Sequence, residues 1–159
     1  MKITKTNAAR LLDKAGIEYE LIPYQVDEDD LSAAHLAGQL GEDVRQVFKT
    51  LVLRGERTGH FVCVVPGDSE VDLKKAARAA GDKKADLIPM KELLPATGYI
   101  RGGCSPIGIK KPFPTFIHDT CKDFSRIYIS AGMRGLQIKI APADLLSYTG
   151  ATVCDLTAD

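Results

Sequence analysis

Apolar residues recur at helical spacing in three short segments of the chain. In each segment the positions i, i+3, i+4 and i+7 are apolar, which is the pattern of a helix with one buried face. Each segment begins shortly after a residue suited to an N-cap and ends next to a glycine. The apolar faces are narrow and rich in alanine, so we expect helices that lie over a sheet. These helices are residues 8–15, 33–40 and 73–80, with Thr6, Ser32 and Asp72 as their N-caps.

Runs rich in β-branched and aromatic residues between these segments predict strands. A further helix is expected over residues 143–148, because Pro142 suits the first turn of a helix. Helices and strands alternate without a strict βαβ period. The pattern therefore favours an α+β (mixed α/β) fold, with a mixed, barrel-like β-sheet surrounded by helices. The expected strands are residues 19–24, 50–54, 61–65, 115–118, 127–130, 136–140 and 152–154.

The composition is that of a globular protein large enough to build its own core. Hydrophobic residues make up 45% and charged residues 26% of the 159 positions, and no linker or low-complexity stretch divides them. We expect one domain over residues 1–159. The 21 basic and 21 acidic residues cancel, which argues against a dedicated non-specific nucleic-acid binder. Eight cations form either a local rim for an RNA backbone or ordinary solvated charges: Lys74, Lys75, Arg78, Lys83, Lys84, Arg101, Lys110 and Lys111.

Targeting and metal signals are absent from the sequence. The first residues carry no apolar core of a secretion signal, and no apolar run approaches the length of a membrane span. We therefore expect a cytoplasmic protein that works without a membrane. The four cysteines are widely spaced, with no Cys-x-x-Cys pair and no histidine at ligand spacing. Reduced thiols are expected, with neither a metal site nor a cofactor.

The loop of residues 101–108 is the strongest candidate for a binding site. Gly102 and Gly103 remove the side chains that would keep a ligand from the backbone, and Pro106 biases Ser105 toward an extended conformation. Such a loop can aim several N–H groups at a phosphate or a developing oxyanion. The alternative is a glycine-rich turn that only joins two elements.

Lys49 opens the apolar run that continues with Thr50. With a period of two, Lys49 shares a face with Leu51 and Leu53. If the leucines face the core, Lys49 points inward near the end of its strand, where it needs an anion or another partner. The alternative is a surface lysine at a strand terminus.

Cys104 and Ser105 are candidate nucleophiles, but a nucleophile needs a base. The histidines are His35 in an expected helix, His60 after a turn and His118 in an expected strand. His118 has the character of a structural histidine. No Gly-x-Ser-x-Gly motif is present, so a conventional serine or cysteine hydrolase is disfavoured. Cys104 is better interpreted as a small filler residue.

Residues 130–135 form an expected hairpin turn that contains Ser130, Gly132 and Arg134. The glycines of this segment can supply the positive φ that a tight turn requires. Functionally, the turn presents a hydroxyl and a guanidinium beside whatever the glycine loop binds.

Together these segments resemble the YbaK family of free-standing editing proteins, which are related to the insertion domain of bacterial prolyl-tRNA synthetases. The resemblance rests on Val-Phe-Lys-Thr-Leu at 47–51, Asp-Leu-Lys-Lys at 72–75, Thr-Gly-Tyr-Ile-Arg-Gly-Gly-Cys-Ser-Pro at 97–106 and Tyr-Ile-Ser-Ala-Gly-Met-Arg-Gly-Leu at 128–136. It runs from about Ala8 to Leu156, with the motifs in the family order.

The resemblance implies hydrolytic removal of a wrong amino acid from tRNA, most typically cysteine from tRNA(Pro) and, as an alternative substrate, from tRNA(Cys). The implied partners are the 3′ acceptor end of aminoacyl-tRNA and prolyl-tRNA synthetase. The family lysine matches Lys49, and the family loop that receives the substrate carbonyl matches residues 102–106. The implied catalytic residues are Lys49, Gly102 and Gly103, and the implied substrate-binding residues are Tyr24, Thr50, Cys104, Ser105, Pro106, Ser130, Gly132 and Arg134.

Two positions and one acidic stretch depart from the family pattern. Ala131 replaces the first glycine of a Ser-Gly-Gly turn, a mild change if φ stays negative there. Gln137 replaces the aspartate that commonly follows the Gly-Leu pair, so a mechanism that needs a carboxylate there is in doubt. The acidic stretch 27–30 is also atypical.

An aminoacyl ester is already activated, so the enzyme has mainly to position it and stabilise the oxyanion. Lys49 is suited to anchor the terminal phosphate or another anion. Attack comes from water or, as the family suggests for cysteine, from the substrate's thiol, which releases a thiolactone and makes the reaction formally that of a lyase. The alternatives are a deacylase for another small amino acid such as alanine, a non-catalytic tRNA- or synthetase-binding module, and a thiol hydrolase that uses Cys104.

Overall fold

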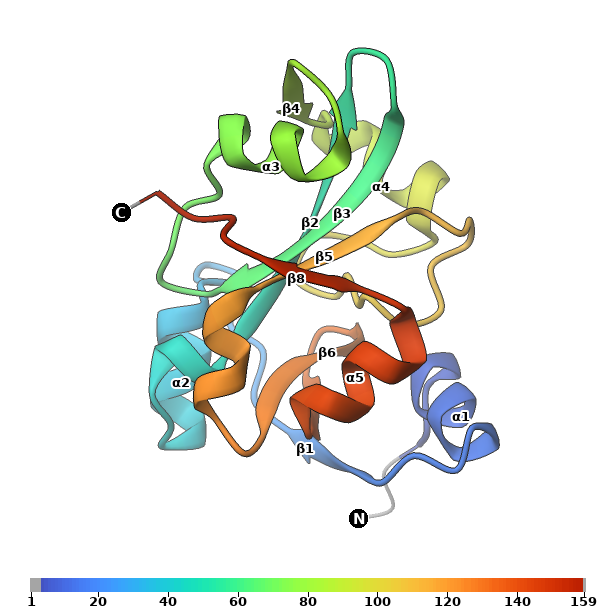
Figure 1. Ribbon diagram of the computed structural model, residues 1–159. Coiled ribbons are helices and arrows are strands. Elements are labelled where there is room, and N and C mark those ends of the chain that lie inside the picture. Colours follow the sequence, from blue (N-terminus) through green and yellow to red (C-terminus); the bar gives the residue numbers. More distant parts are fainter. Residues whose placement is uncertain (1–3, 159) are drawn as a thin grey trace.

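The computed structural model describes residues 4–158 (Figure 1). The helices are α1 (Asn7–Lys14), α2 (Ala33–Leu40), α3 (Leu73–Ala80), α4 (Met90–Thr97) and α5 (Pro142–Thr149). The strands are β1 (Tyr19–Pro23), β2 (Phe48–Gly55), β3 (Gly59–Pro66), β4 (Ala85–Leu87), β5 (Thr115–His118), β6 (Ile127–Met133), β7 (Leu136–Ile140) and β8 (Thr152–Cys154). Two 3₁₀ turns, η1 (Val44–Gln46) and η2 (Asp119–Asp123), complete the described elements.

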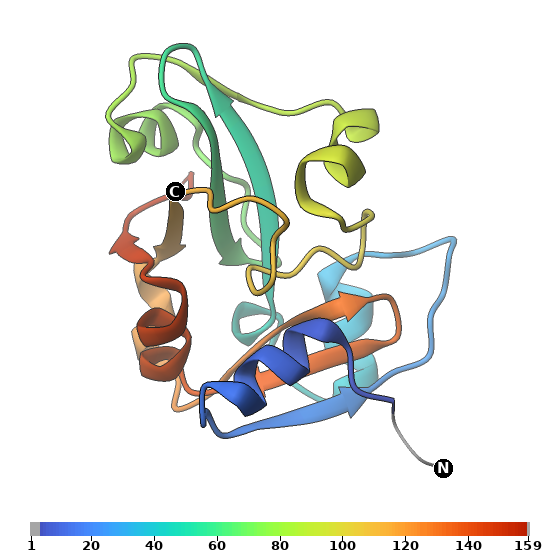
Figure 2. The same cartoon turned by 90° about the vertical axis from the view of Figure 1, so that its right-hand side faces the viewer.

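The strands form two sheets. The five-stranded sheet has the order β4-β2-β3-β5-β8, with parallel pairs β3–β5 and β5–β8, and the three-stranded antiparallel sheet has the order β1-β7-β6. In Figure 2 the green β2 and β3 run down toward the orange β6 and β7 and the blue β1. The α+β class and the mixed sheet are confirmed. The barrel-like closure is wrong, because within residues 4–158 the sheets share only one bridge, between Val47 and Tyr128.

The alternation of side chains along β3 divides the core. Val62 and Val64 face the space between the two sheets, where α1 and α5 also pack. Phe61, Cys63 and Val65 face the alanines of α3 on the other side of the sheet. Because both faces of β3 are covered, the sequence of this strand is a continuous apolar run. No helix within residues 4–158 is long and apolar enough to cross a membrane.

The sequence pattern locates most of these elements. The bounds expected for α2, α3, β5, β7 and β8 are confirmed, and Thr6, Ser32 and Asp72 each accept a hydrogen bond from a backbone N–H of the helix that follows. β4 and α4 were not predicted. α4 follows Pro89, which makes no side-chain cap, and contains Pro95, which lacks a helical N–H. β6 extends to Met133, so most of the expected turn at 130–135 belongs to this strand.

Candidate active site

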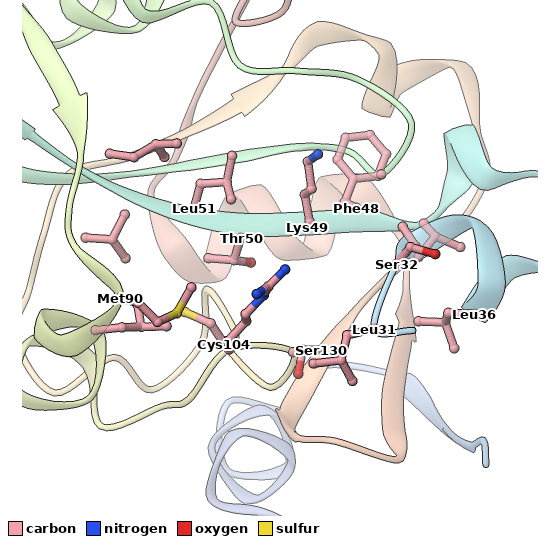
Figure 3. A pocket seen from close by; sticks show the side chains of 18 of the residues that line it. Leu31, Ser32, Leu36, Phe48, Lys49, Thr50, Leu51, Met90, Cys104 and Ser130 are labelled. Carbon is pink, nitrogen blue, oxygen red and sulfur yellow. The ribbon is translucent and has the colours of Figure 1, made fainter. Parts of the chain in front are cut away.

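A pocket of about 690 Å³ lies at the edge of β2 between the two sheets (Figure 3). This volume is within the range of small-molecule sites. The five-stranded sheet contributes Lys49 and Thr50 from β2, and the three-stranded sheet contributes Ser130 and Gln137 from β6 and β7. Further parts of the wall come from residues 29–33, from Leu87, Ile88 and Met90, and from the glycine loop.

The pocket opens where β2 loses its neighbour. β2 pairs with β3 along its whole length but with β4 only from Leu53 onward. The Val52 carbonyl accepts a hydrogen bond from Ile88 N–H on the β4 side. Backbone groups two residues apart point the same way in a strand, so the N–H and C=O of Thr50 also face this side, where none of the described strands covers them.

The free edge brings both faces of β2 into one pocket. Figure 3 shows Lys49 and Leu51 on one side of the strand and Thr50 on the other, toward Cys104. Lys49 shares the face of the leucines, as expected, and is half-buried. Its ammonium has no hydrogen bond or ion pair with any residue that the structure describes. A half-buried cation without a counter-ion on a pocket wall is suited to an anionic ligand.

The glycine loop is held in place by hydrogen bonds that leave two of its N–H groups unused. The Gly103 N–H donates to the Ile100 carbonyl at 3.0 Å, and Arg134 Nε donates to the Arg101 carbonyl at 2.9 Å. The N–H groups of Gly102 and Cys104 have no acceptor among residues 4–158, and both residues line the pocket. These two N–H groups are therefore the candidate oxyanion donors, whereas that of Gly103 is engaged in the turn.

Both glycines of the loop are required by the geometry. Gly102 has φ of 84°, a conformation that other residues rarely adopt. At Gly103, a Cβ would lie 3.1 Å from the Met133 Cα and 3.3 Å from the Arg134 nitrogen. These are backbone atoms, so a side chain at Gly103 would push the loop away from the β6–β7 hairpin.

The structure disfavours a nucleophilic role for the two candidate side chains in the loop. Burial raises the pKa of the Cys104 thiol to about 12, so thiolate is scarce at neutral pH. Ser105 is fully buried, and its hydroxyl accepts a hydrogen bond from the Ile107 N–H at 3.2 Å. None of the histidines lines this pocket. His35 lies in a smaller adjoining cavity, and His60 stacks on Phe113.

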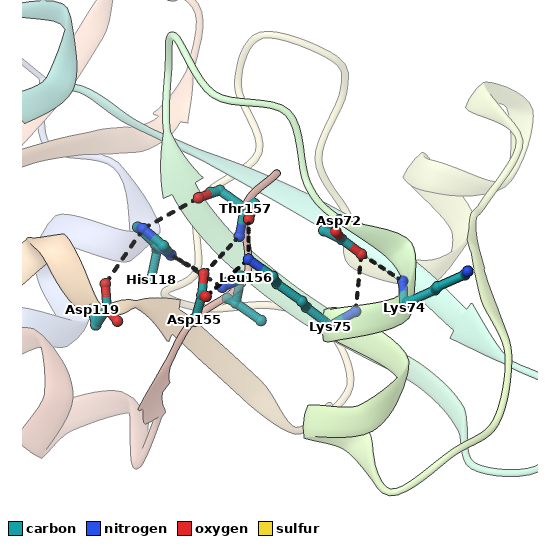
Figure 4. A network of polar contacts seen from close by, with 8 residues as sticks. All are labelled: Asp72, Lys74, Lys75, His118, Asp119, Asp155, Leu156 and Thr157. Carbon is teal, nitrogen blue, oxygen red and sulfur yellow. Dashed lines mark hydrogen bonds and ion pairs between the residues drawn. The ribbon is translucent and has the colours of Figure 1, made fainter. Parts of the chain in front are cut away.

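His118, the third histidine, serves the fold (Figure 4). Its Nδ1 accepts a hydrogen bond from the Leu156 N–H at 3.1 Å, and Nε2 lies 3.3 Å from the Thr157 hydroxyl oxygen. Lys75 Nζ donates to Asp155 Oδ2 at 2.9 Å and to the Thr157 carbonyl at 2.8 Å. The structural interpretation of His118 is confirmed: the ring ties the end of β5 to the segment that follows β8.

We expect His118→Phe to lower the free energy of unfolding by about 1–3 kcal/mol, because the buried N–H of Leu156 loses its acceptor. Urea unfolding followed by circular dichroism measures this loss. His60→Phe is the matched control, since His60 Nε2 has no hydrogen-bond partner in the described structure. Equal losses for the two variants would contradict the structural role of His118.

The structure brings together five of the residues expected in the site: Lys49, Thr50, Gly102, Cys104 and Ser130 all line the pocket. Tyr24 lines the smaller adjoining cavity, to which Gly102 also contributes. The remaining expected residues, Gly103, Ser105, Pro106, Gly132 and Arg134, lie outside the lining.

Two of the residues outside the lining form hydrogen bonds to residues that line the pocket. Gly132 has φ of 104°, lies within the irregular pairing of β6 with β7 between Ser130 and Met133, and donates its N–H to the Ser130 hydroxyl at 3.1 Å. Arg134 holds the glycine loop through the Arg101 carbonyl. No described residue other than glycine has a positive φ, so the replacement at Ala131 costs no backbone strain.

Several lining residues escaped the sequence prediction. Leu87, Ile88 and Met90 form one wall, from the end of β4 to the start of α4, and residues 29–33 form another. Sequence spacing shows no link between these segments and the glycine loop. Of the eight cations of the suggested basic rim, only Arg101 lines the pocket, and Lys75 is engaged with Asp155 and Thr157.

Comparisons with known proteins agree with this architecture. The aminoacyl-tRNA editing domain family matches residues 27–148. The Enterococcus faecalis protein EbsC, whose name gives Cys-tRNA(Pro)/Cys-tRNA(Cys) deacylase as its proposed activity, is 46% identical over 153 residues, which are 96% of this chain and 93% of that protein. Proline–tRNA ligase of Fervidobacterium nodosum is 33% identical over 79 residues, or 50% of this chain and 14% of the ligase.

The fold has also been observed before. A crystal structure of a protein proposed as a trans-editing enzyme for prolyl-tRNA synthetase superposes with a TM-score of 0.84 at 26% identity, over 98% of this chain and 100% of that chain. The resemblance to the YbaK family is confirmed. The chain belongs to the aminoacyl-tRNA editing domain family.

Proposed function

We propose that this protein is a trans-editing aminoacyl-tRNA deacylase that removes cysteine from tRNA(Pro) in the cytoplasm. The observation that carries the proposal is one pocket with an unpaired cation, Lys49, and two unused N–H groups, those of Gly102 and Cys104. This arrangement suits an ester attached to a phosphate-bearing polymer. The sequence relationship to EbsC supports cysteine as the amino acid.

In the proposed reaction, Lys49 and the glycine loop have different roles. Lys49 pairs with an anionic group of the tRNA end, and the loop N–H groups stabilise the oxyanion that forms at the ester carbonyl. The cysteine thiol of the substrate attacks this carbon, its proton passes to the leaving 3′ oxygen, and the C–O bond breaks. The products are a cyclic thiolactone and free tRNA. No protein nucleophile is required, in keeping with the buried states of Cys104 and Ser105.

A deacylation assay with a panel of aminoacyl-tRNAs tests the proposal. We expect rapid release of cysteine from Cys-tRNA(Pro), with the thiolactone detected by mass spectrometry, and slower release of alanine and proline. Preferential release of alanine would assign a different substrate. Binding of tRNA without release of any amino acid would overturn the proposal in favour of a binding module.

We also expect recognition of tRNA by the isolated protein to be weak. The net charge is zero, and the pocket lining holds the carboxylates of Asp29, Asp30 and Glu70 as well as the cations Lys49 and Arg101. Prolyl-tRNA synthetase is the proposed partner that supplies affinity. Fluorescence titration should show tRNA affinity that falls steeply with salt and rises when the synthetase is added. Tight binding that is insensitive to salt would contradict this expectation.

A further inference from the structure

The pocket wall holds two buried oxygen atoms that have no hydrogen-bond partner among residues 4–158. One is Oε1 of Gln137, a side chain that is only 3% exposed, and the other is Oγ1 of Thr50. Both residues line the pocket, one from each sheet. Buried polar atoms are nearly always paired, so an unpaired one in a binding site calls for a partner from the ligand.

The missing partner is a hydrogen-bond donor. An amide carbonyl oxygen only accepts, and a threonine oxygen can accept. The described protein supplies no donor to either atom. Ser130 is paired with Gln137 across β6 and β7, but its hydroxyl, which accepts the Gly132 N–H, makes no hydrogen bond to Gln137 Oε1. The donor therefore comes from outside the chain.

The α-amino group of the aminoacyl ester fits this requirement. Arg101 and Met90 are exposed at the mouth, whereas Gln137, Ser130 and Cys104 are buried, so the nucleotide stays at the mouth and the amino acid enters. An amino group carries two or three donors and can serve two acceptors, whereas a thiol has one weak donor and the ester carbonyl has none. We infer that Gln137 Oε1 and Thr50 Oγ1 form a subsite for the α-amino group. This inference rests on the proposed function.

The subsite is neutral, and its two acceptors favour a free α-amino group over an N-acylated one. Neither an amide nor a hydroxyl carries a charge, so the subsite accepts the amino group in its charged or its neutral form. An ester whose nitrogen is acylated has a single N–H and a bulky substituent. The two acceptors therefore separate tRNA with a free amino acid from tRNA with an N-blocked residue.

Two non-hydrolysable ligands that differ only in the amino group test the inference. They are 3′-cysteinylamino-3′-deoxyadenosine and its 3-mercaptopropanoyl counterpart, and binding is measured by calorimetry. The wild-type protein should bind the cysteinyl ligand at least about tenfold more tightly, the value of one good hydrogen bond. Gln137→Met and the isosteric Thr50→Val should each weaken the cysteinyl ligand roughly tenfold and leave the other ligand within about twofold.

Thr152→Val is the matched control, because Thr152 is exposed on β8 and does not line the pocket. The Thr152→Val variant should bind both the cysteinyl and the 3-mercaptopropanoyl ligand as tightly as the wild-type protein does. A third ligand, 3′-alanylamino-3′-deoxyadenosine, keeps the amino group but lacks the thiol. It should bind the two pocket variants more weakly than the wild-type protein, as the cysteinyl ligand does. A loss confined to the cysteinyl ligand would assign the two oxygens to the thiol and overturn the inference.

The inference is also overturned if the wild-type protein binds both ligands equally or binds neither, or if the pocket variants weaken both equally. These measurements need no turnover. Amine selectivity in a protein that deacylates no tRNA would leave the subsite standing and refute the proposed function. Deacylation of Cys-tRNA(Pro) without amine selectivity would refute the subsite alone.

Discussion

Lys49→Ala is expected to lower kcat/KM for deacylation at least about a hundredfold, comparable to the loss of one oxyanion-stabilising group. Lys49 has no counter-ion among residues 4–158, and its position on the pocket wall assigns that role to the substrate. Single-turnover deacylation of Cys-tRNA(Pro) measures the effect.

Two further variants separate charge from packing at this position. Lys49→Met keeps most of the side-chain stem without the ammonium and should be as inactive as Lys49→Ala. Lys49→Arg should also be poor, because a planar guanidinium does not replace a compact ammonium. Lys111→Ala, at an exposed lysine outside the lining, is the control and should stay active. Near-normal turnover by Lys49→Met would remove the charge from the mechanism.

Gly102→Ala is expected to lower the deacylation rate about a hundredfold or more. Gly102 has φ of 84°, and a Cβ there would lie 3.2 Å from Arg134 Nε and 3.5 Å from Leu31 Cδ1. The substituted loop must rotate away from this φ, which moves the N–H that we propose as an oxyanion donor. Gly103→Ala should be similarly damaging, because its Cβ meets the backbone of the β6–β7 hairpin.

Gly98→Ala is the matched control for the glycine loop. Gly98 has the same φ of 84°, but a Cβ there meets only Lys110 Cβ at 3.9 Å, and Gly98 does not line the pocket. Its backbone strain should lower the melting temperature without lowering the rate. Cys104→Ala keeps the backbone N–H and should retain most of the rate. An inactive Cys104→Ala, or an acyl-enzyme trapped on Cys104 or Ser105, would refute a backbone mechanism.

The sequence predicts the parts of this fold that depend on local pattern. α2 and α3 carry a side-chain cap, a helical apolar stripe and a terminal glycine, so their bounds follow from the sequence. α4 has no side-chain cap and contains a proline, so its helix depends on tertiary packing of residues such as Leu93. Closure of the sheet was mispredicted because strand spacing does not reveal which edges meet.

The candidate site was predictable only in its motif-bearing parts. Lys49, Thr50 and the glycine loop stand in short segments whose composition reveals them. Gln137 departs from the family pattern, but that its Oε1 is unpaired follows only from the placement of β7 beside β6 at the pocket. The sequence also does not show which N–H groups of the loop are free, because the hydrogen bond from the Gly103 N–H to the Ile100 carbonyl depends on the folded turn.

The two-sheet construction has a consequence for how such proteins diversify. The sheets share the Val47–Tyr128 bridge and no other within residues 4–158, so the gap between them depends on the side chains packed there, such as Val64, Ile117 and Ile138. A change of one methylene in such a core is felt by its neighbours. Substitutions that never touch a substrate can thus widen or narrow the pocket while Lys49 and the glycine loop stay unchanged. The width of the pocket and the groups proposed to act on the ester therefore depend on different parts of the chain.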